Sequence, residues 1–192
     1  SMFFETLIGK KILVAATGLF MIIFLIAHLA GNLEIYAGPL ALNHYSAFLR
    51  TMPKILWGLR IALILSLIVH VYLTISLTIH NKNARPKDYA LKTVRKATIS
   101  SRTMMISGLT IFAFVLYHLA HYTWGLTDPE LMTLLDKEGH HHTYNMVVMG
   151  FSSPLISGFY ILAQVLLAFH LSHGFSSAAR TFGVMDKKLY EK

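Results

Sequence analysis

Four long apolar segments, separated by polar loops, account for most of the sequence. They lie at about 12–31, 55–79, 103–124 and 154–178. Each is long enough to cross a bilayer, which takes about 20 residues, and each is predicted to be a helix because an open strand in lipid would leave its backbone groups unpaired. Pro53 and Pro154 fall where the second and fourth segments begin, and a helix start tolerates proline. The pattern predicts an all-α fold, a polytopic transmembrane bundle of four spans that forms one domain over residues 1–192.

A shorter apolar segment, PLALNHYSAFLR at residues 39–50, cannot span a membrane. Its apolar residues recur at roughly helical spacing, which is typical of an amphipathic helix lying along a membrane interface. An ordinary structured loop fits the same pattern, so both interpretations stay open.

Composition supports a membrane protein and restricts its cofactors. Only 14% of the residues are charged, against about a quarter in a soluble domain. The chain has no cysteine, which excludes disulfides, thiolate-bound iron–sulfur clusters and haem attached through cysteines. Any haem in this chain must therefore be held by histidine or methionine.

The charged residues divide the loops by sign. Seven cations lie between the second and third segments, against the single acid Asp88: Lys82, Arg85, Lys87, Lys92, Arg95, Lys96 and Arg102. The loop after the third segment is acidic. By the positive-inside rule, the N-terminus, the C-terminus and the 80–102 loop are predicted to be cytoplasmic. Topology and contact with membrane lipid explain the net charge of +8, so no nucleic-acid partner is predicted.

Each apolar segment contains one histidine well inside it: His28, His70, His118 and His170. Counted from the polar residues at the predicted inner ends, His28 and His118 lie 17 and 16 residues inside, and the other two lie 10 residues inside. At about 1.5 Å per residue, these counts give two pairs at two levels, roughly 10 Å apart.

Two histidines at one level on facing helices can hold one haem iron from both sides, as in cofactor-binding bundles. A haem with both axial positions filled suits electron transfer, so two such layers would conduct electrons across the membrane. A zinc site is disfavoured because each level supplies too few ligands. Histidines that only hydrogen-bond to neighbouring helices are the structural alternative.

A weak internal repeat selects the same histidines. At an offset of 90 residues, the first segment matches the third in six residue pairs: Gly18 with Gly108, Leu19 with Leu109, Phe24 with Phe114, His28 with His118, Leu29 with Leu119 and Ala30 with Ala120. Small residues beside the histidines, such as Gly31 and Gly174, would admit a flat macrocycle, although small residues are also common where membrane helices pack.

The histidine-containing stretches resemble one known family. They read FLIAHLAGN, LSLIVHVYL, FVLYHLAHYTW and, in the fourth segment, an S-S-P start with an H-x-S-x-G ending. They are similar to the dihaem cytochrome b (b558-type) membrane-anchor subunit of succinate dehydrogenase and fumarate reductase, respiratory complex II, over nearly the whole chain.

The resemblance implies two b haems, with His70 and His170 on the proximal iron and His28 and His118 on the distal iron. It implies flavoprotein and iron–sulfur partner subunits on the cytoplasmic side, menaquinone as the quinone, and a prokaryotic inner membrane. The chain would then be the flavin-free subunit of a succinate:quinone oxidoreductase. Such anchors usually have five spans and four are seen here, which leaves the quinone pocket and partner docking open.

Two rival functions fit the same spans. A cytochrome b subunit of a formate dehydrogenase or hydrogenase would use the same haem ligands with different partners. A haem-free structural membrane anchor would use the histidines only for packing.

Three further polar residues lie near the proposed ligands. His121 and His173 follow His118 and His170 by three residues and are predicted either to bind a haem propionate or water, or to lie at the interface. Arg60 is predicted to extend toward the membrane surface, with contact to a propionate or a quinone carbonyl as the alternative.

The remaining polar residues receive simpler interpretations. The HHHT run at 140–143 is predicted to be a solvated loop, because adjacent histidines on a flexible segment rarely make a closed metal site. His44 and His80 are predicted to be interfacial. Glu34 is a candidate proton relay for quinone chemistry.

Overall fold

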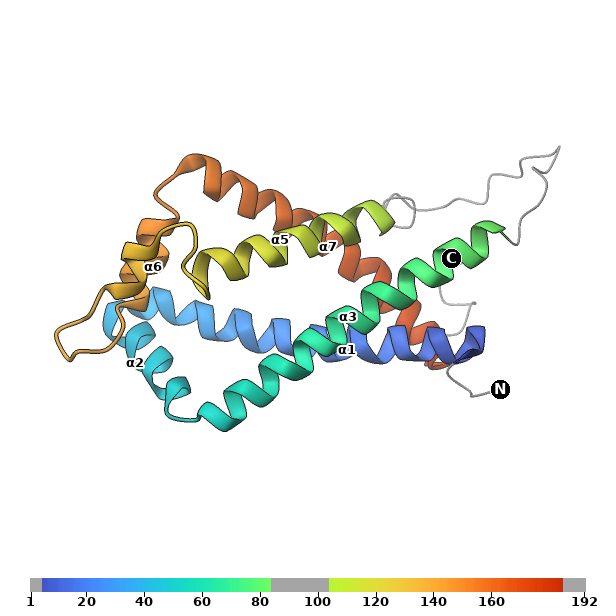
Figure 1. Ribbon diagram of the computed structural model, residues 1–192, viewed down its shortest axis with the longest axis horizontal. Helices are drawn as coiled ribbons and strands as arrows, with labels where there is room; N and C mark the ends of the chain where they lie inside the picture. Colours follow the sequence, from blue (N-terminus) through green and yellow to red (C-terminus); the bar gives the residue numbers. More distant parts are fainter. Residues whose placement is uncertain (1–4, 84–103, 185–192) are drawn as a thin grey trace.

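The computed structural model describes residues 5–83 and 104–184, which fold as helices without any named strand (Figure 1). The four predicted spans are the helices α1 (Leu7–Asn32), α3 (Pro53–Asn83), α5 (Met104–Tyr122) and α7 (Pro154–Thr181). All four are long and apolar enough to cross a membrane, which confirms the predicted helical fold. Helix α1 begins earlier than predicted because the Thr6 hydroxyl caps it by accepting a hydrogen bond from the Gly9 N–H at 3.0 Å.

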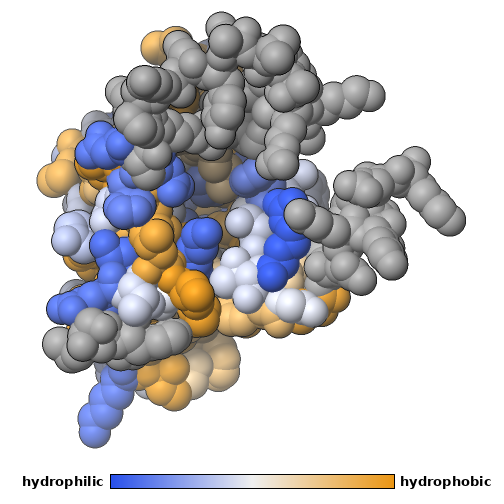
Figure 2. All heavy atoms as spheres, turned by 90° about the vertical axis from the view of Figure 1, so that its right-hand side faces the viewer, coloured by the Kyte–Doolittle hydropathy of each residue, from blue (hydrophilic) through white to orange (hydrophobic). Residues whose placement is uncertain are grey.

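Consecutive long helices run in opposite directions along the bundle (Figure 1). Helix α1 packs against α3 and α7, and α5 packs against α7, so α1 and α7 are the central pair. Near the start of α1, the Lys10 ammonium donates a hydrogen bond to the Ser76 hydroxyl of α3 at 3.1 Å. Figure 2 views the end at which α1 begins, where hydrophilic side chains gather beside apolar flanks.

Large apolar side chains cover the outside of the bundle. Ile8, Ile26 and Leu155 are 68%, 65% and 84% exposed, and the fully buried apolar residues are few among those described. In water this much apolar surface would be unfavourable at about 25 cal/mol per Å². The same surface is suited to hydrocarbon, so the exposure pattern agrees with a multi-pass membrane protein.

Shorter elements close the end of the bundle away from the start of α1 (Figure 1). They are the 3-10 helix η2 (Leu33–Ala37), α2 (Pro39–Arg50), the 3-10 helix η3 (Pro129–Thr133) and α6 (Thr143–Gly150). We call residues 33–52 and 123–153 the cap. Segment 39–50 is therefore helical, as one of its two interpretations predicted, whereas α6 was not predicted.

Residues 134–142 of the cap form a tight hairpin loop. Leu135 and His141 make an antiparallel bridge, and the Asp136 N–H donates to the His140 carbonyl at 2.8 Å. Gly139 turns the chain with a φ of +79°, a conformation that favours glycine. The loop is thus ordered by its own backbone hydrogen bonds.

Asn43 ties this hairpin loop to α2. Its side chain is 2% exposed; the amide nitrogen donates to Asp136 Oδ2 at 3.2 Å, and the amide oxygen accepts from the Tyr144 N–H at 3.0 Å. Desolvation raises the pKa of Asp136, but hydrogen bonds from the backbone N–H groups of His140 and Glu138 outweigh it, so this pKa lies below its ordinary value. Asp136 is therefore ionised at neutral pH and held by several donors.

The predicted orientation depends on residues that the structure does not describe. Six of the seven cations of the 80–102 loop, from Arg85 to Arg102, lie outside the described residues, as do Lys187, Lys188 and Lys192. The cytoplasmic position of the N-terminus therefore stays a prediction from the sequence.

Replacing Asn43 with Ala should loosen the hairpin loop. The substitution removes the donor to Asp136 and leaves the partly buried Tyr144 N–H without its acceptor, a loss of about 1–3 kcal/mol in unfolding free energy. Limited proteolysis in detergent should then cut within residues 134–142 faster than in the parent protein. Leu40→Ala, an exposed change on the same helix, is the control, and equal cleavage of the two variants would contradict the role of Asn43.

Candidate functional site

The imidazole of His70 on α3 packs against a group of polar atoms on α1, and we call such a group, with the glycine beside it, the seat of the histidine. Its Nδ1 lies 3.1 Å from the Val14 carbonyl and 3.2 Å from the Thr17 hydroxyl, which itself donates to the Leu13 carbonyl at 2.8 Å. A carbonyl only accepts, so Nδ1 must carry the imidazole proton. Nε2 therefore keeps its lone pair, and no described residue hydrogen-bonds to it. This is the state of a histidine ready to bind a metal.

His170 on α7 has a matching seat on α5. Its Nδ1 lies 3.3 Å from the Ser107 hydroxyl. Ser107 is almost fully buried and donates to the Met104 carbonyl at 3.1 Å. Because the Ser107 hydroxyl gives its proton to Met104, its oxygen accepts from Nδ1 of His170, and Nε2 of His170 keeps its lone pair. We call His70 and His170, which lie within electrostatic reach of each other, the far pair.

The two seats follow the internal repeat of 90 residues. They correspond as Val14 with Met104, Thr17 with Ser107 and Gly18 with Gly108. A Cβ at Gly18 would lie 3.3 Å from Cε1 of His70, and one at Gly108 would lie 3.2 Å from Cε1 of His170. Each glycine therefore makes room for an imidazole, which gives a physical reason for the matched glycines.

His28 on α1 and His118 on α5 form the second pair, which we call the cap-side pair. Their ring centroids lie 5.9 Å apart with an interplanar angle of 82°. His28 stacks on Phe24 at 5.4 Å, and His118 stacks on Phe114 at 5.9 Å, one turn earlier in each helix. The matched phenylalanines of the repeat thus support equivalent histidines.

His118 begins a chain of polar contacts that leads to Asp128 in the cap. Its Nδ1 lies 3.3 Å from the Tyr160 hydroxyl, which lies 3.0 Å from Nδ1 of His121. Nε2 of His121 lies 3.6 Å from a carboxylate oxygen of Asp128. One proton arrangement satisfies both hydrogen bonds of Tyr160: His118 donates to Tyr160, and Tyr160 donates to His121. The His121 N–H then faces the carboxylate of Asp128 from beyond hydrogen-bond distance.

The side chain of His121 is buried inside the protein. It is 2% exposed, inside an aromatic cluster that includes Tyr122, on which its ring stacks at 3.9 Å. A contact with a propionate or water and a position at the interface both stay predictions for His121.

The other predicted polar residues lie apart from the pairs. Arg60 lies over the Trp57 ring at 5.1 Å on its own helix, a cation–π contact, and both interpretations of Arg60 stay predictions. His173 is half-buried and makes no hydrogen bond with a described residue. Gly31 accommodates Tyr45, whose hydroxyl would lie 2.6 Å from an added Cβ, so Gly31 serves helix packing rather than a macrocycle.

Several site residues were not predicted. Thr17, Ser107 and Tyr160 orient the imidazoles, and the first two share the offset of the repeat that matched the glycines, so the signal was present. His44 and His140, predicted to be interfacial and solvated, lie together around Glu138. Residues so far apart in the sequence meet only after the hairpin loop has formed.

The cap-side pair fits a metal held between two imidazoles. Each nitrogen–metal bond is about 2 Å long, so the centroids of two opposed rings around one ion lie about 6 Å apart. The 5.9 Å separation of His28 and His118 agrees with this. Along α1, Gly18 precedes His28 by ten residues, which places the two layers about 15 Å apart. This spacing exceeds the 10 Å obtained by counting from the polar ends, a count that assumed a common starting plane.

Comparisons with protein-family models, with curated proteins and with solved structures found no match for this chain. The functional interpretation therefore depends on the residues and their geometry.

Glycine replacements should separate the histidine seats from ordinary helix positions. Gly158→Ala points into open space, so it should raise the unfolding free energy by about 0.5–1 kcal/mol through the lower flexibility of the unfolded chain. Gly18→Ala and Gly108→Ala should raise the unfolding free energy by less than this, or lower it, because the added methyl group crowds an imidazole. The thermal stability of the three variants is compared in one detergent. Equal stabilisation at all three positions would contradict the close packing of the imidazoles against Gly18 and Gly108.

Proposed function

We propose that this chain is a dihaem cytochrome b that anchors a succinate:quinone oxidoreductase in a prokaryotic inner membrane. It would pass electrons between an iron–sulfur subunit on the cytoplasmic side and menaquinone. The flavin chemistry on succinate or fumarate would take place in a partner subunit. The partner subunits, the quinone and the type of membrane are inferred from the sequence resemblance. The geometry of the histidines supports haem binding.

The observation that carries the proposal is the pairing of the four intramembrane histidines. Residues about 90 to 100 positions apart approach in two layers, each with one histidine from each half of the repeat. A packing role needs only the Nδ1 hydrogen bonds of the far histidines, whereas Nε2 of each keeps a lone pair and has no hydrogen-bond partner among the described residues. A role as iron ligands accounts for this arrangement.

Each residue of the site has a distinct task in this scheme. His70 and His170 would hold one b haem, and His28 and His118 the other, in a form with no open position for oxygen. The bound haems supply one-electron oxidation and reduction. The Val14 carbonyl and the Thr17 hydroxyl fix the ring orientation and proton position of His70 before the cofactor binds.

The polar contacts that lead from Asp128 through His121 and Tyr160 change the basicity of the His118 imidazole. A carboxylate that polarises Tyr160 through His121 draws the Nδ1 proton of His118 outward and makes Nε2 a stronger donor. A stronger donor stabilises the more positively charged oxidised iron. The contacts from Asp128 through His121 and Tyr160 would therefore lower the reduction potential of a haem held by the cap-side pair.

Histidine replacements test the two-layer scheme by visible spectroscopy and haem assay. The purified protein should contain two b-type centres. His70→Ala should remove one centre and His28→Ala the other, whereas His80→Ala, an exposed histidine at the end of α3, should keep both. His121→Ala should also keep both, since His121 is not a ligand. A protein without any reduced-minus-oxidised absorption band would refute the proposal.

Tyr160→Phe tests the contact chain without removing a ligand. Both haems should remain, and the potential of the cap-side centre should rise by about 40 mV, the one-electron equivalent of a hydrogen bond of about 1 kcal/mol. Asp128→Asn should shift it in the same direction. Tyr117→Phe, the same change within the same aromatic cluster but without a hydrogen bond to a described residue, is the control. Equal shifts of the reduction potential in Tyr160→Phe and Tyr117→Phe would contradict a specific role of the Tyr160 hydroxyl.

A further inference from the structure

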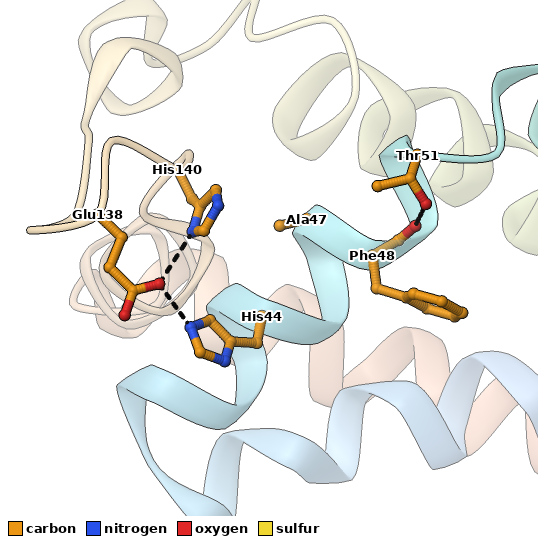
Figure 3. Close-up of a pocket in the computed structure, with 6 residues that line it drawn as sticks. All are labelled: His44, Ala47, Phe48, Thr51, Glu138 and His140. Carbon is orange, nitrogen blue, oxygen red and sulfur yellow. Dashed lines mark hydrogen bonds and ion pairs between the residues drawn. The ribbon is translucent and has the colours of Figure 1, made fainter.

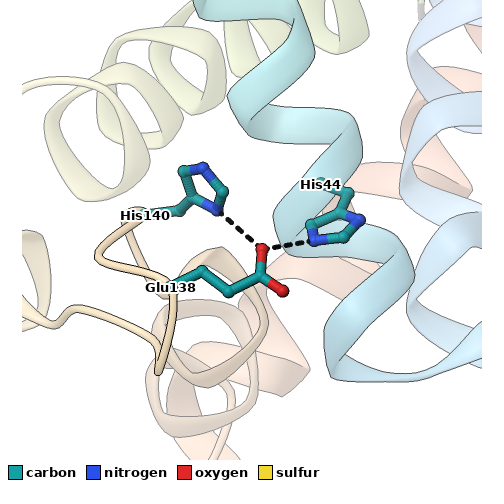
Figure 4. A group of neighbouring side chains, drawn as sticks. All are labelled: His44, Glu138 and His140. Atoms are coloured by element: carbon teal, nitrogen blue, oxygen red, sulfur yellow. Dashed lines mark hydrogen bonds and ion pairs between the residues drawn. The ribbon is translucent and has the colours of Figure 1, made fainter.

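Three side chains from two parts of the cap converge on one point at its surface. His44 comes from α2, and Glu138 and His140 come from the hairpin loop (Figure 4). Nε2 of His44 lies 2.7 Å from Oε2 of Glu138, and Nδ1 of His140 lies 3.5 Å from the same oxygen. The three ligand atoms all lie within 4.8 Å of one another.

One of these atoms lacks a hydrogen-bond partner. Nδ1 of His140 is buried although the rest of its ring is partly exposed, and no described group hydrogen-bonds to it. Its nearest carboxylate oxygens belong to Glu138 at 3.5 Å and Asp136 at 3.8 Å. A buried nitrogen that faces two carboxylates without a hydrogen bond is unfavourable, unless a cation lies between them.

Hydrogen bonds from neighbouring residues hold the backbone of the cluster in place. Asp136 Oδ1 accepts hydrogen bonds from the N–H groups of Glu138 and His140 at 3.0 and 2.9 Å, which fixes the backbone of both candidate ligands. Asn43, the neighbour of His44, holds Asp136 from α2. The two halves of the cluster are therefore in register before any ion binds, which lowers the entropic cost of binding.

We propose that His44, Glu138 and His140 bind one Zn²⁺ ion. Two imidazole nitrogens and one carboxylate oxygen form a ligand set that suits zinc, whereas calcium and magnesium prefer oxygen alone. Two ligand atoms of a tetrahedral zinc ion lie about 3.4 Å apart. The pair of His140 and Glu138 already has this spacing, and the half-exposed Glu138 side chain has room to move away from His44.

Three protein ligands leave the fourth position of the ion open. Beside the cluster lies a depression of about 460 Å³, whose lining also includes Ala47, Phe48 and Thr51 (Figure 3). Water or a small exogenous ligand would complete the coordination from this side. The ion would tie α2 to the hairpin loop, two segments that the chain itself connects only through α3 and α5.

Binding of Zn²⁺ to the full chain tests the site. The protein is purified without a polyhistidine tag and titrated with Zn²⁺ against a competing chelator, and zinc is counted by mass spectrometry separately from iron. One Zn²⁺ per chain is expected. Loss of an outer partner of a metal ligand costs about 10–100-fold in affinity, so His44→Ala and Glu138→Gln should each weaken binding by at least about tenfold.

The matched control is His80→Ala, which removes an exposed histidine at the opposite end of the bundle and should bind Zn²⁺ as the parent does. Glu138→Gln keeps the size of the side chain, and circular dichroism without zinc checks that both variants fold. A parent protein that binds no stoichiometric zinc, or a tight site that survives in both His44→Ala and Glu138→Gln, would overturn the proposal. The test does not depend on haem binding.

Discussion

An imidazole inside an apolar helix bundle needs a hydrogen-bond partner from another helix, and this requirement shapes the structure. Leaving such a group unpaired costs about 2–7 kcal/mol. On α1 the requirement is met by a carbonyl, a hydroxyl three residues later and a glycine four residues later. Because the side chain at i+4 covers the carbonyl at i, the glycine both uncovers the Val14 carbonyl and makes room for the ring of His70. The register of α3 on α1 follows from this contact, as does that of α7 on α5.

The sequence predicted the spans well because apolar length is a local property. The short helix 39–50 was one of two open interpretations, and the four intramembrane histidines stood out because polar residues are rare at that depth. The seats on α1 and α5 were also within reach, since Thr17 and Ser107 share the repeat offset with the glycines. Hydroxyl residues are common in membrane helices, so their function became visible only with the distances to the imidazoles.

Two features depended on tertiary structure and could not be predicted from local patterns. The burial of His121 follows from the way that α5 turns one face toward Tyr160. The cluster of His44, Glu138 and His140 needs a hairpin loop whose bends are set by Gly139 and Asp136. The rule that adjacent histidines rarely make a closed site was sound for the run itself. It missed the cluster because only one histidine of that run takes part, and the other two ligands come from elsewhere.

The cap reaches the cap-side pair through neighbouring residues, whereas the far pair lies farther from the cap along the bundle. Tyr45 of α2 packs over Gly31, one turn from His28, and Asp128 of the cap faces His121. Among the described residues, the far histidines hydrogen-bond to neutral carbonyl and hydroxyl groups, while His118 is linked through Tyr160 and His121 to a carboxylate. An anionic partner stabilises positive charge more than a neutral one does, so the two layers differ in electrostatics although the repeat makes their helices alike. In the proposed electron path, this difference would lower the potential of the cap-side layer, and it arises from Tyr160, His121 and Asp128 rather than from the four ligands.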